Sequence, residues 1–217
     1  MKVLGIETSG NIGEVAICKD RHVVITKDFG AGMQHSKELI PAIKDIFTQA
    51  SWAFRDIDLI AVDVGPGSYT GLRIGVACAK TLAYALNKPV IDVPLFDIIA
   101  ESYPLDTTPI CPVLNARRNC VYACIYTCEN AQRKRLSEFM MIQPEKLLTI
   151  LPRPVVVFGD GISPHITIFQ QKDIFIDAEE KATPKAKYVA LLGERRYESG
   201  QRCDRDKLLP FYLRPIS

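Results

Sequence analysis

Residues 58–83 read DLIAVDVGPGSYTGLRIGVACAKTLA, and this stretch predicts a strand, a tight turn and a helix in succession. Its first seven residues form an apolar run that is typical of a buried strand. A turn is expected at residues 65–67 (Gly-Pro-Gly), because glycine accepts unusual backbone angles and proline fixes φ. A helix is expected over about residues 71–86, with Ser68 and Thr70 as candidate N-terminal caps.

Small residues recur every four positions along this helix and therefore share one face: Gly71, Gly75, Ala79 and Ala83. An interior glycine costs a helix about 1 kcal/mol relative to alanine. Two such residues on one face therefore indicate that another backbone approaches closely. The spacing alone leaves two alternatives open. Either this face packs on the chain's own sheet, or it receives a partner, as small-residue faces of membrane helices do.

The order of strands and helices in the first half predicts a mixed α/β sheet with helices on its faces. We expect three strands, a helix, a strand, the helix described above, a strand and a helix, at residues 2–7, 14–18, 23–28, 35–50, 58–64, 71–86, 89–93 and 95–103. The Pro- and Thr-rich segment YPLDTTP (103–109) predicts a boundary between two lobes, residues 1–105 and 106–217.

The second half is less regular. We expect strands at residues 110–116, 120–128, 137–142 and 155–158, a short helix at 143–151 and an amphipathic helix at 185–199. Cys120, Cys124 and Cys128 have the spacing of one helix face, which would suggest a metal site. Because their context CVYACIYTC is rich in β-formers, we expect them on one face of a strand, about 13 Å apart and too distant to share a metal.

Composition indicates a globular protein: 217 residues, 47% apolar, 24% charged and a net charge of +2. No run is long enough for a signal-peptide core or a membrane span, so we expect a cytoplasmic protein with reduced cysteines and no membrane partner. The charge is −3 over residues 1–110 and +5 over residues 111–217. The positive half suits either contact with nucleic acid or an ordinary solvated surface.

Six segments resemble, in their order, the TsaB (YeaZ) family of bacterial tRNA threonylcarbamoyladenosine biosynthesis proteins: LGIETSGNIGEVAI, QHSKELIP, the opening stretch, LNARRNCVYACIY, FGDG and PFYLRP. The resemblance implies an actin/sugar-kinase/Hsp70-like α/β fold of two lobes, the second reduced. It also implies a subunit without catalysis of its own. Such a subunit binds the catalytic paralogue TsaD together with the ATPase TsaE. The complex transfers a threonylcarbamoyl group to the adenosine beside the anticodon of tRNAs that read ANN codons.

Under this resemblance, the expected association surface is the small-residue face of the helix with its apolar neighbours: Gly71, Leu72, Gly75, Val76, Ala79 and Ala83. The same face is expected to hold a homodimer when the paralogue is absent. Gly75→Leu or Ala79→Arg would then break both complexes and leave the monomer folded. Contact with tRNA is expected only through the complex.

The resemblance also marks a possible nucleotide or anion loop. In the superfamily the turn after the first strand holds phosphates through backbone N–H groups, and here Glu7, Thr8, Ser9 and Gly10 form it, with Glu7 where the family usually has Asp. The glycine cluster at residues 159–161 lacks a longer Gly-rich pattern. We therefore expect no cofactor of the chain's own, with ATP or ADP at an interface with a partner left open.

No catalytic residue and no metal site is expected. The catalytic paralogues carry two histidines at HxxxH spacing on a helix, whereas here His35 is followed by Leu39. Ser68 does not fit the G-x-S-x-G pattern of a hydrolase nucleophile. The alternative is an enzyme in its own right, either an ATPase of the superfamily or a metallopeptidase-like protein.

Overall fold

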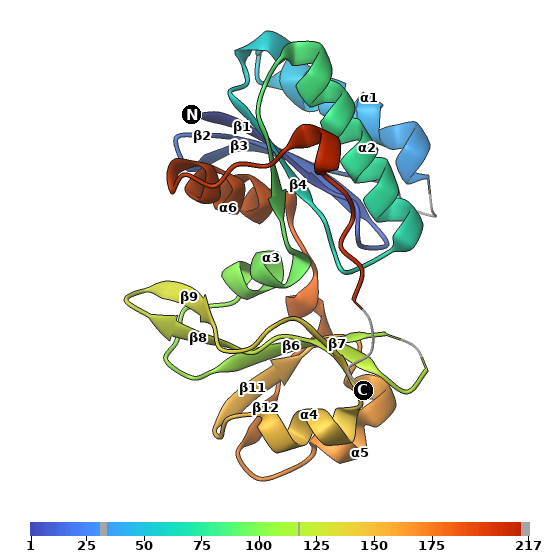
Figure 1. The fold of residues 1–217 in the computed structure, drawn as a ribbon, viewed down its shortest axis with the longest axis vertical. Coiled ribbons are helices and arrows are strands. Elements are labelled where there is room, and N and C mark those ends of the chain that lie inside the picture. Colours follow the sequence, from blue (N-terminus) through green and yellow to red (C-terminus); the bar gives the residue numbers. More distant parts are fainter. Residues whose placement is uncertain (31–33, 117, 214–217) are drawn as a thin grey trace. The chain divides into compact units, whose positions relative to one another are not determined.

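A computed structural model describes residues 1–30, 34–116 and 118–213, and the chain divides into two compact units (Figure 1). The first unit comprises Met1–Ile98 and Pro184–Phe211, and the second comprises Ile99–Thr183 with the chain from Tyr212 onward. This division differs from the contiguous lobes 1–105 and 106–217 expected from the sequence, because the chain returns to the first unit after Thr183.

The first unit is built on a mixed five-stranded sheet in the order β3-β2-β1-β4-β5. The strands are β1 (Lys2–Glu7), β2 (Gly13–Lys19), β3 (His22–Phe29), β4 (Leu59–Asp63) and β5 (Val90–Val93). The first three form an antiparallel meander, and β1, β4 and β5 are parallel. The mixed sheet that the sequence predicts is therefore present.

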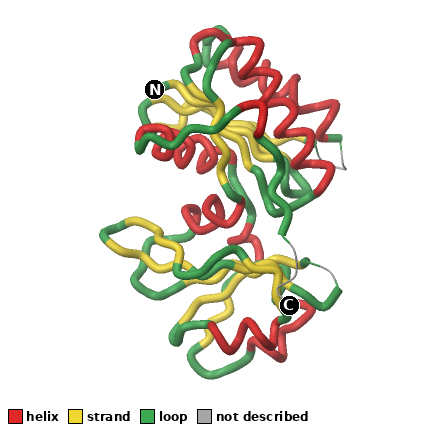
Figure 2. The backbone as a smooth tube through the Cα atoms, in the orientation of Figure 1, coloured by secondary structure: helices red, strands yellow, loops and turns green. Residues whose placement is uncertain are grey.

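Helices cover both faces of this sheet (Figure 2). Alternate residues of β1 pack against α1 (His35–Gln49) and α2 (Tyr69–Leu86) on one face, and the others pack against α6 (Ala186–Glu198) on the opposite face. A further helix, α3 (Leu95–Ser102), follows β5. In the part of the chain that the structure describes, no helix is both long and apolar enough to cross a membrane.

Two glycines explain why α6 belongs to the first unit. A β-carbon at Gly5 of β1 would lie 2.4 Å from the Ala186 carbonyl oxygen, and one at Gly193 of α6 would lie 2.4 Å from the Ala61 β-carbon. Helix and sheet are thus in close contact at two points.

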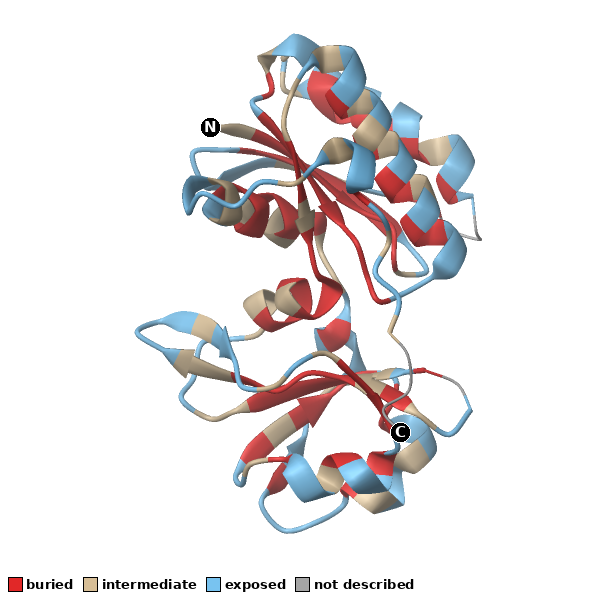
Figure 3. Cartoon of the chain, in the orientation of Figure 1, coloured by how far each residue is buried: buried red, intermediate tan, exposed pale blue. Residues whose placement is uncertain are grey.

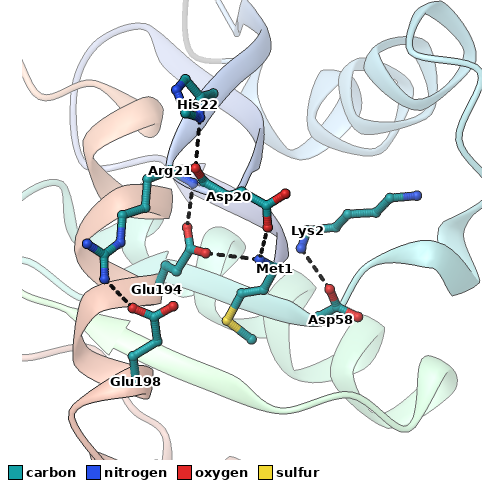
Figure 4. A network of polar contacts seen from close by, with 8 residues as sticks. All are labelled: Met1, Lys2, Asp20, Arg21, His22, Asp58, Glu194 and Glu198. Carbon is teal, nitrogen blue, oxygen red and sulfur yellow. Dashed lines mark hydrogen bonds and ion pairs between the residues drawn. The ribbon is translucent and has the colours of Figure 1, made fainter.

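Polar contacts of Glu194 and Glu198 hold the C-terminal part of α6 to the sheet (Figure 4). The buried Glu194 side chain accepts hydrogen bonds from the Met1 amino group and from the Arg21 N–H, both at 3.1 Å. Arg21 also forms an ion pair with Glu198. These contacts fix α6 on the first sheet, although the sequence placed it in the second lobe.

The second unit has its own mixed sheet in the order β10-β7-β6-β11-β12, with β8 paired to β6 and to β9. Its strands are β6 (Ile110–Asn115), β7 (Val121–Ala123), β8 (Tyr126–Glu129), β9 (Gln132–Arg135), β10 (Met140–Ile142), β11 (Val155–Phe158) and β12 (Ile174–Ile176). Two short helices, α4 (Pro144–Ile150) and α5 (Ile166–Phe169), complete it. Leu147 and Phe169 from these helices are fully buried in its core, and strands β6, β7, β10 and β11 are also mostly buried (Figure 3).

The expected strand at residues 120–128 is broken in the structure. Cys120 precedes β7, Cys124 lies between β7 and β8, and Cys128 lies on β8, so the three cysteines do not share one continuous strand. The two strands differ in their partners. β7 pairs with β10 and β6, whereas β8 meets β6 only at Tyr126 and pairs along its length with β9. Two strands of the second unit, β9 and β12, were not expected from the sequence.

Candidate functional site: helix α2 and the turn after β1

Helix α2 starts as the sequence predicts. Gly65 has a φ of +97°, a conformation that favours glycine, and Ser68 is the N-cap residue. The Ser68 hydroxyl oxygen accepts a hydrogen bond from the Gly71 N–H at 3.2 Å, which satisfies one of the helix's free N–H groups. Thr70 lies inside the first turn and is exposed, so Ser68 alone acts as the cap.

The small-residue face of α2 packs against the chain itself. A β-carbon at Gly71 would lie 2.0 Å from the carbonyl oxygen of Thr8, and one at Gly75 would lie 2.2 Å from the Thr8 hydroxyl. Ala79 and Ala83 are fully buried against the core of the sheet. The backbone that approaches this face is therefore that of the chain's own β1 turn.

The predicted association surface is therefore wrong. All six of its residues are buried in the first unit: Gly71, Leu72, Gly75, Val76, Ala79 and Ala83. A partner cannot reach them while α2 stays on its sheet. Of the two alternatives that the spacing left open, internal packing is the one observed.

The opposite side of α2 is solvent-exposed, and we call it the outer face of α2: Tyr69, Thr70, Arg73, Ala77, Thr81 and Tyr84. The Tyr69 and Tyr84 side chains are 60% and 74% exposed. Arg73 donates to the Tyr69 hydroxyl at 3.1 Å and lies over its ring. Most of these residues are four positions apart in the sequence: Tyr69, Arg73, Ala77 and Thr81. This spacing, with a tyrosine near each end of the helix, could have indicated the outer face.

Two buried carboxyl groups lie at the ends of β1 and β4, beside the turn that follows β1. β1 and β4 are parallel with Ile6 opposite Val62, so Glu7 and Asp63 end neighbouring strands side by side, and both are fully buried. One oxygen of Glu7, Oε1, accepts three hydrogen bonds: from Ser9 N–H at 2.5 Å, Ser9 hydroxyl at 2.6 Å and Gly10 N–H at 3.2 Å. Asp63 Oδ1 accepts the Gly65 N–H at 2.7 Å.

Burial determines the protonation of this pair. Desolvation, with the neighbouring Asp63 charge in addition, raises the pKa of Glu7 to about 8, against the lowering effect of its three hydrogen bonds. Desolvation also raises the pKa of Asp63, but less, because the Gly65 N–H donates to Asp63 and the neighbouring Ser9 and Glu7 side chains favour its charged form. At neutral pH the pair therefore holds about one proton between its two carboxyl groups.

The turn does not fit a nucleotide phosphate as it stands. The N–H groups of Ser9 and Gly10, which the sequence predicted to face an anion, already donate to Glu7. Thr8 is fully buried with its hydroxyl against Gly75. In the described ranges no group of three or more His, Cys, Asp or Glu side chains has an arrangement that could hold a metal ion.

His35 and Leu39 are both buried residues of helix α1. His35 begins α1, is buried, and packs edge-on against the Phe29 ring with centroids 5.6 Å apart. Leu39, at the position where the paralogues have a second histidine, lies in the core. The His35 ring is therefore enclosed at the start of the helix.

The basic residues of the second half lie in different parts of the chain. Arg117 is outside the described residues. Arg133 donates to the carbonyl oxygens of Tyr103 and Pro104, and Arg196 pairs with Asp92 and Asp97. Residues 99–183 hold 9 Lys or Arg and 10 Asp or Glu, so the positive charge of the second half comes from the chain after residue 183. Most of that segment belongs to the first unit.

The glycines at residues 159–161 serve close packing. A β-carbon at Gly159 would lie 2.4 Å from the Val113 carbonyl oxygen, and one at Gly161 would lie 2.8 Å from the Leu114 carbonyl carbon. Between them, Asp160 accepts the Asn115 N–H at 2.9 Å. This turn fastens β11 to β6.

Residues 27–213 match the family model described as TsaD: tRNA N6-adenosine threonylcarbamoyltransferase. The chain belongs to this family. Within it, the chain is similar to the tRNA threonylcarbamoyladenosine biosynthesis protein TsaB of Bacillus subtilis, at 29% identity over 99% of this chain and 94% of that protein. Similarity to a tRNA N6-adenosine threonylcarbamoyltransferase of Moorella thermoacetica, at 35% identity, covers 42% of this chain and 31% of that protein. The resemblance to the TsaB (YeaZ) family is confirmed.

Solved structures confirm the fold. YeaZ from Pseudomonas aeruginosa superposes with a TM-score of 0.85 over 98% of this chain and 99% of that chain, at 24% identity. A ROK family protein from Streptococcus pneumoniae has a TM-score of 0.50 over 92% of this chain and 100% of that one, at 9% identity. The expected actin/sugar-kinase/Hsp70-like α/β fold is therefore present.

Proposed function

We propose that this chain is a non-catalytic accessory subunit in tRNA threonylcarbamoyladenosine biosynthesis. It binds a TsaD-type catalytic paralogue through the outer face of α2 and acts with a TsaE-type ATPase in the cytoplasm. Family membership and the end-to-end similarity to TsaB support the pathway. The proposal that it binds through α2 rests on the outer face of that helix. This face is exposed, whereas the small-residue face is buried against the chain's own sheet.

The outer face has the composition of an association surface. Tyrosine and arginine are enriched at protein interfaces and among the residues that carry binding energy. The centre of the stripe is flat, because it is formed by Ala77 and Thr81, and the Thr81 hydroxyl donates to the Ala77 carbonyl at 2.8 Å. Small central residues let a second helix approach closely. The same face would hold a homodimer when the paralogue is absent.

The buried carboxyl pair supports the non-catalytic role. Glu7 and Asp63 are fully enclosed and bonded within their own turns. A catalytic acid or base has to reach the atom whose proton it transfers, within about 3 Å or through one water. The pair is therefore part of the scaffold in this proposal.

Assembly of the two purified proteins tests the proposal. We expect Ala77→Arg and Thr81→Arg to abolish the complex with the TsaD-type paralogue, because each places a long charged side chain at the centre of the outer face. Val24→Arg is the matched control, since Val24 is 41% exposed on the edge strand β3. Size-exclusion chromatography with light scattering reports the complex, and circular dichroism reports the fold. Complex formation by Ala77→Arg at the wild-type level would contradict the proposal.

A further inference from the structure

The turn after β1 has the geometry of an anion-binding site. Two backbone N–H groups and one hydroxyl, from Ser9 and Gly10, converge on a single oxygen. Successive N–H groups in a turn form a concave site, called a nest, that binds anions. Here the bound oxygen is Oε1 of Glu7, which lies only two and three residues before its donors.

Within the described part of the chain, the second oxygen of each carboxyl group lacks a hydrogen-bond donor. Treated as carboxylates, Glu7 Oε2 and Asp63 Oδ2 are both buried and have no donor among the residues that the structure describes. Leaving two buried charged oxygens without donors is costly. One proton between the two groups removes both deficits, because the acid then donates to the carboxylate. A hydrogen bond from Glu7 to Asp63 is consistent with the lowering effect of Glu7 on the pKa of Asp63.

Other charged groups around the pair have partners of their own. Glu14 on β2 stands directly opposite Glu7 and accepts the Ala186 N–H at 2.7 Å. Burial raises the pKa of Glu14, and this hydrogen bond with the nearby Lys185 and Lys187, at the start of α6, acts in the opposite direction. On this face of the sheet the shared proton therefore concerns Glu7 and Asp63.

We propose that Ser9 and Gly10 form an anion nest whose ligand is the chain's own Glu7 carboxyl, joined to Asp63 by one shared proton, so that the nest is closed to external phosphate. The superfamily's phosphate turn is thus retained as backbone geometry and filled from inside. Glutamate is suited to this because its longer side chain can curl back onto the N–H groups that follow it. The inference concerns the isolated chain and does not depend on the proposed accessory role.

Small-anion rescue of Glu7→Ala tests the proposal. This substitution removes the atoms of one acetic acid molecule and leaves the donors of Ser9 and Gly10 in place, so acetate should refill the space. We expect saturable stabilisation of Glu7→Ala by acetate, about 3 °C in melting temperature at high concentration, against sodium chloride of equal ionic strength. The stabilisation should be larger at pH 5.5 than at pH 7.5, because the acid form supplies the shared proton. No response of folded Glu7→Ala to acetate would overturn the proposal.

Controls separate the nest from general salt effects. Glu7→Gln keeps the shape and can donate through its amide to Asp63, so it should fold as the wild type does and ignore acetate. The wild type should show no saturable shift with inorganic phosphate. A saturable phosphate shift in the wild type that is lost in Ser9→Ala would overturn the closed nest.

A measurement on the wild type covers the case in which Glu7→Ala does not fold. The carboxyl carbon resonance of Glu7, assigned by its absence in Glu7→Gln, should titrate well above the range of an ordinary glutamate. Its midpoint should fall in Asp63→Asn, where the neighbouring charge is gone. An ordinary midpoint near 4.5 in the folded wild type would overturn the shared proton.

Discussion

Gly71→Ala adds one methyl group to the small-residue face of α2. The substitution should destabilise the monomer if this face packs on the chain's own sheet, and stabilise it if the face is exposed to receive a partner. A β-carbon at Gly71 would lie 2.0 Å from the Thr8 carbonyl oxygen, whereas carbon–oxygen contacts begin at about 3.3 Å. Helix α2 would have to retreat by about 1.3 Å or β1 would have to bend, given that contact limit. The obstacle is backbone, so rotation of a side chain gives no relief.

The expected cost follows from two opposing effects. Overpacking a well-packed core costs about 1–3 kcal/mol, and often more against backbone. Replacing a helical glycine by alanine gains about 1 kcal/mol from helix propensity. Because the obstacle is backbone, the cost lies near the upper end of that range, and we expect Gly71→Ala to destabilise the chain by about 2 kcal/mol net of those two effects. If the face were exposed to receive a partner, the same substitution would stabilise the monomer.

Urea unfolding followed by far-ultraviolet circular dichroism measures the sign. Ala77→Gly on the outer face is the control and should lose only the propensity difference, about 1 kcal/mol. At Gly75 the obstacle is the Thr8 hydroxyl at 2.2 Å, so Thr8→Ala should recover part of the loss caused by Gly75→Ala. Gly71→Ala that unfolds at or above the wild-type urea midpoint would refute internal packing of this face.

Three further outcomes are expected. Because burial raises the pKa of Glu7 from 4.5 to about 8, the unfolded chain loses this proton first, so the contribution of Glu7 to stability should fall between about pH 4.5 and 8, by at most about 1.4 kcal/mol per pH unit; Glu7→Gln should remove this part of the slope in unfolding measured across this range. Gly193→Ala should destabilise by about 2 kcal/mol, because its β-carbon would lie 2.4 Å from that of Ala61 and the overpacking cost exceeds the gain in helix propensity; an unchanged melting temperature would contradict close packing of α6. Tyr103→Phe should cost about 1 kcal/mol, through loss of the 2.6 Å hydrogen bond to Asp177, and an Asp177→Asn variant should show a loss of similar size in the same unfolding assay.

The first sheet could be predicted from the sequence because its strands are bounded by clear signals. The turn before α2 is predictable because Gly65 has the positive φ and Ser68 the N-cap position that were expected of them. The small-residue face was also recognised as a place of close approach. The sequence does not say whose backbone approaches, because Thr8 is more than sixty positions from Gly71 and only the fold brings them together.

The two units could not be predicted as they are. An amphipathic helix at residues 186–198 needs an apolar sheet, but its pattern does not say which of two sheets it covers. Gly5 faces Ala186 of the helix and Gly193 faces Ala61 of the sheet, and these contacts are known only once the fold is known. Strands β9 and β12 were missed because they are four and three residues long and are defined by pairing with β8 and β11.

The buried carboxyl pair was within reach of sequence reasoning. Glu7 and Asp63 each end an apolar strand, and the carboxyl ends of parallel strands lie at one edge of a sheet. Their adjacency would have followed from pairing β1 with β4. The donation of Ser9 and Gly10 to Glu7 depends on the local path of the turn, which residue types alone do not specify.

Reconstituted threonylcarbamoylation tests the central claim most directly. A TsaD-type paralogue and a TsaE-type ATPase would be combined with substrate tRNA and with no added chain, the wild-type chain, Ala77→Arg or Val24→Arg, and the modified adenosine would be quantified. The account predicts modification with the wild type and Val24→Arg, and loss to the level without the chain for a folded Ala77→Arg. Full modification with Ala77→Arg, or without this chain at all, would contradict it.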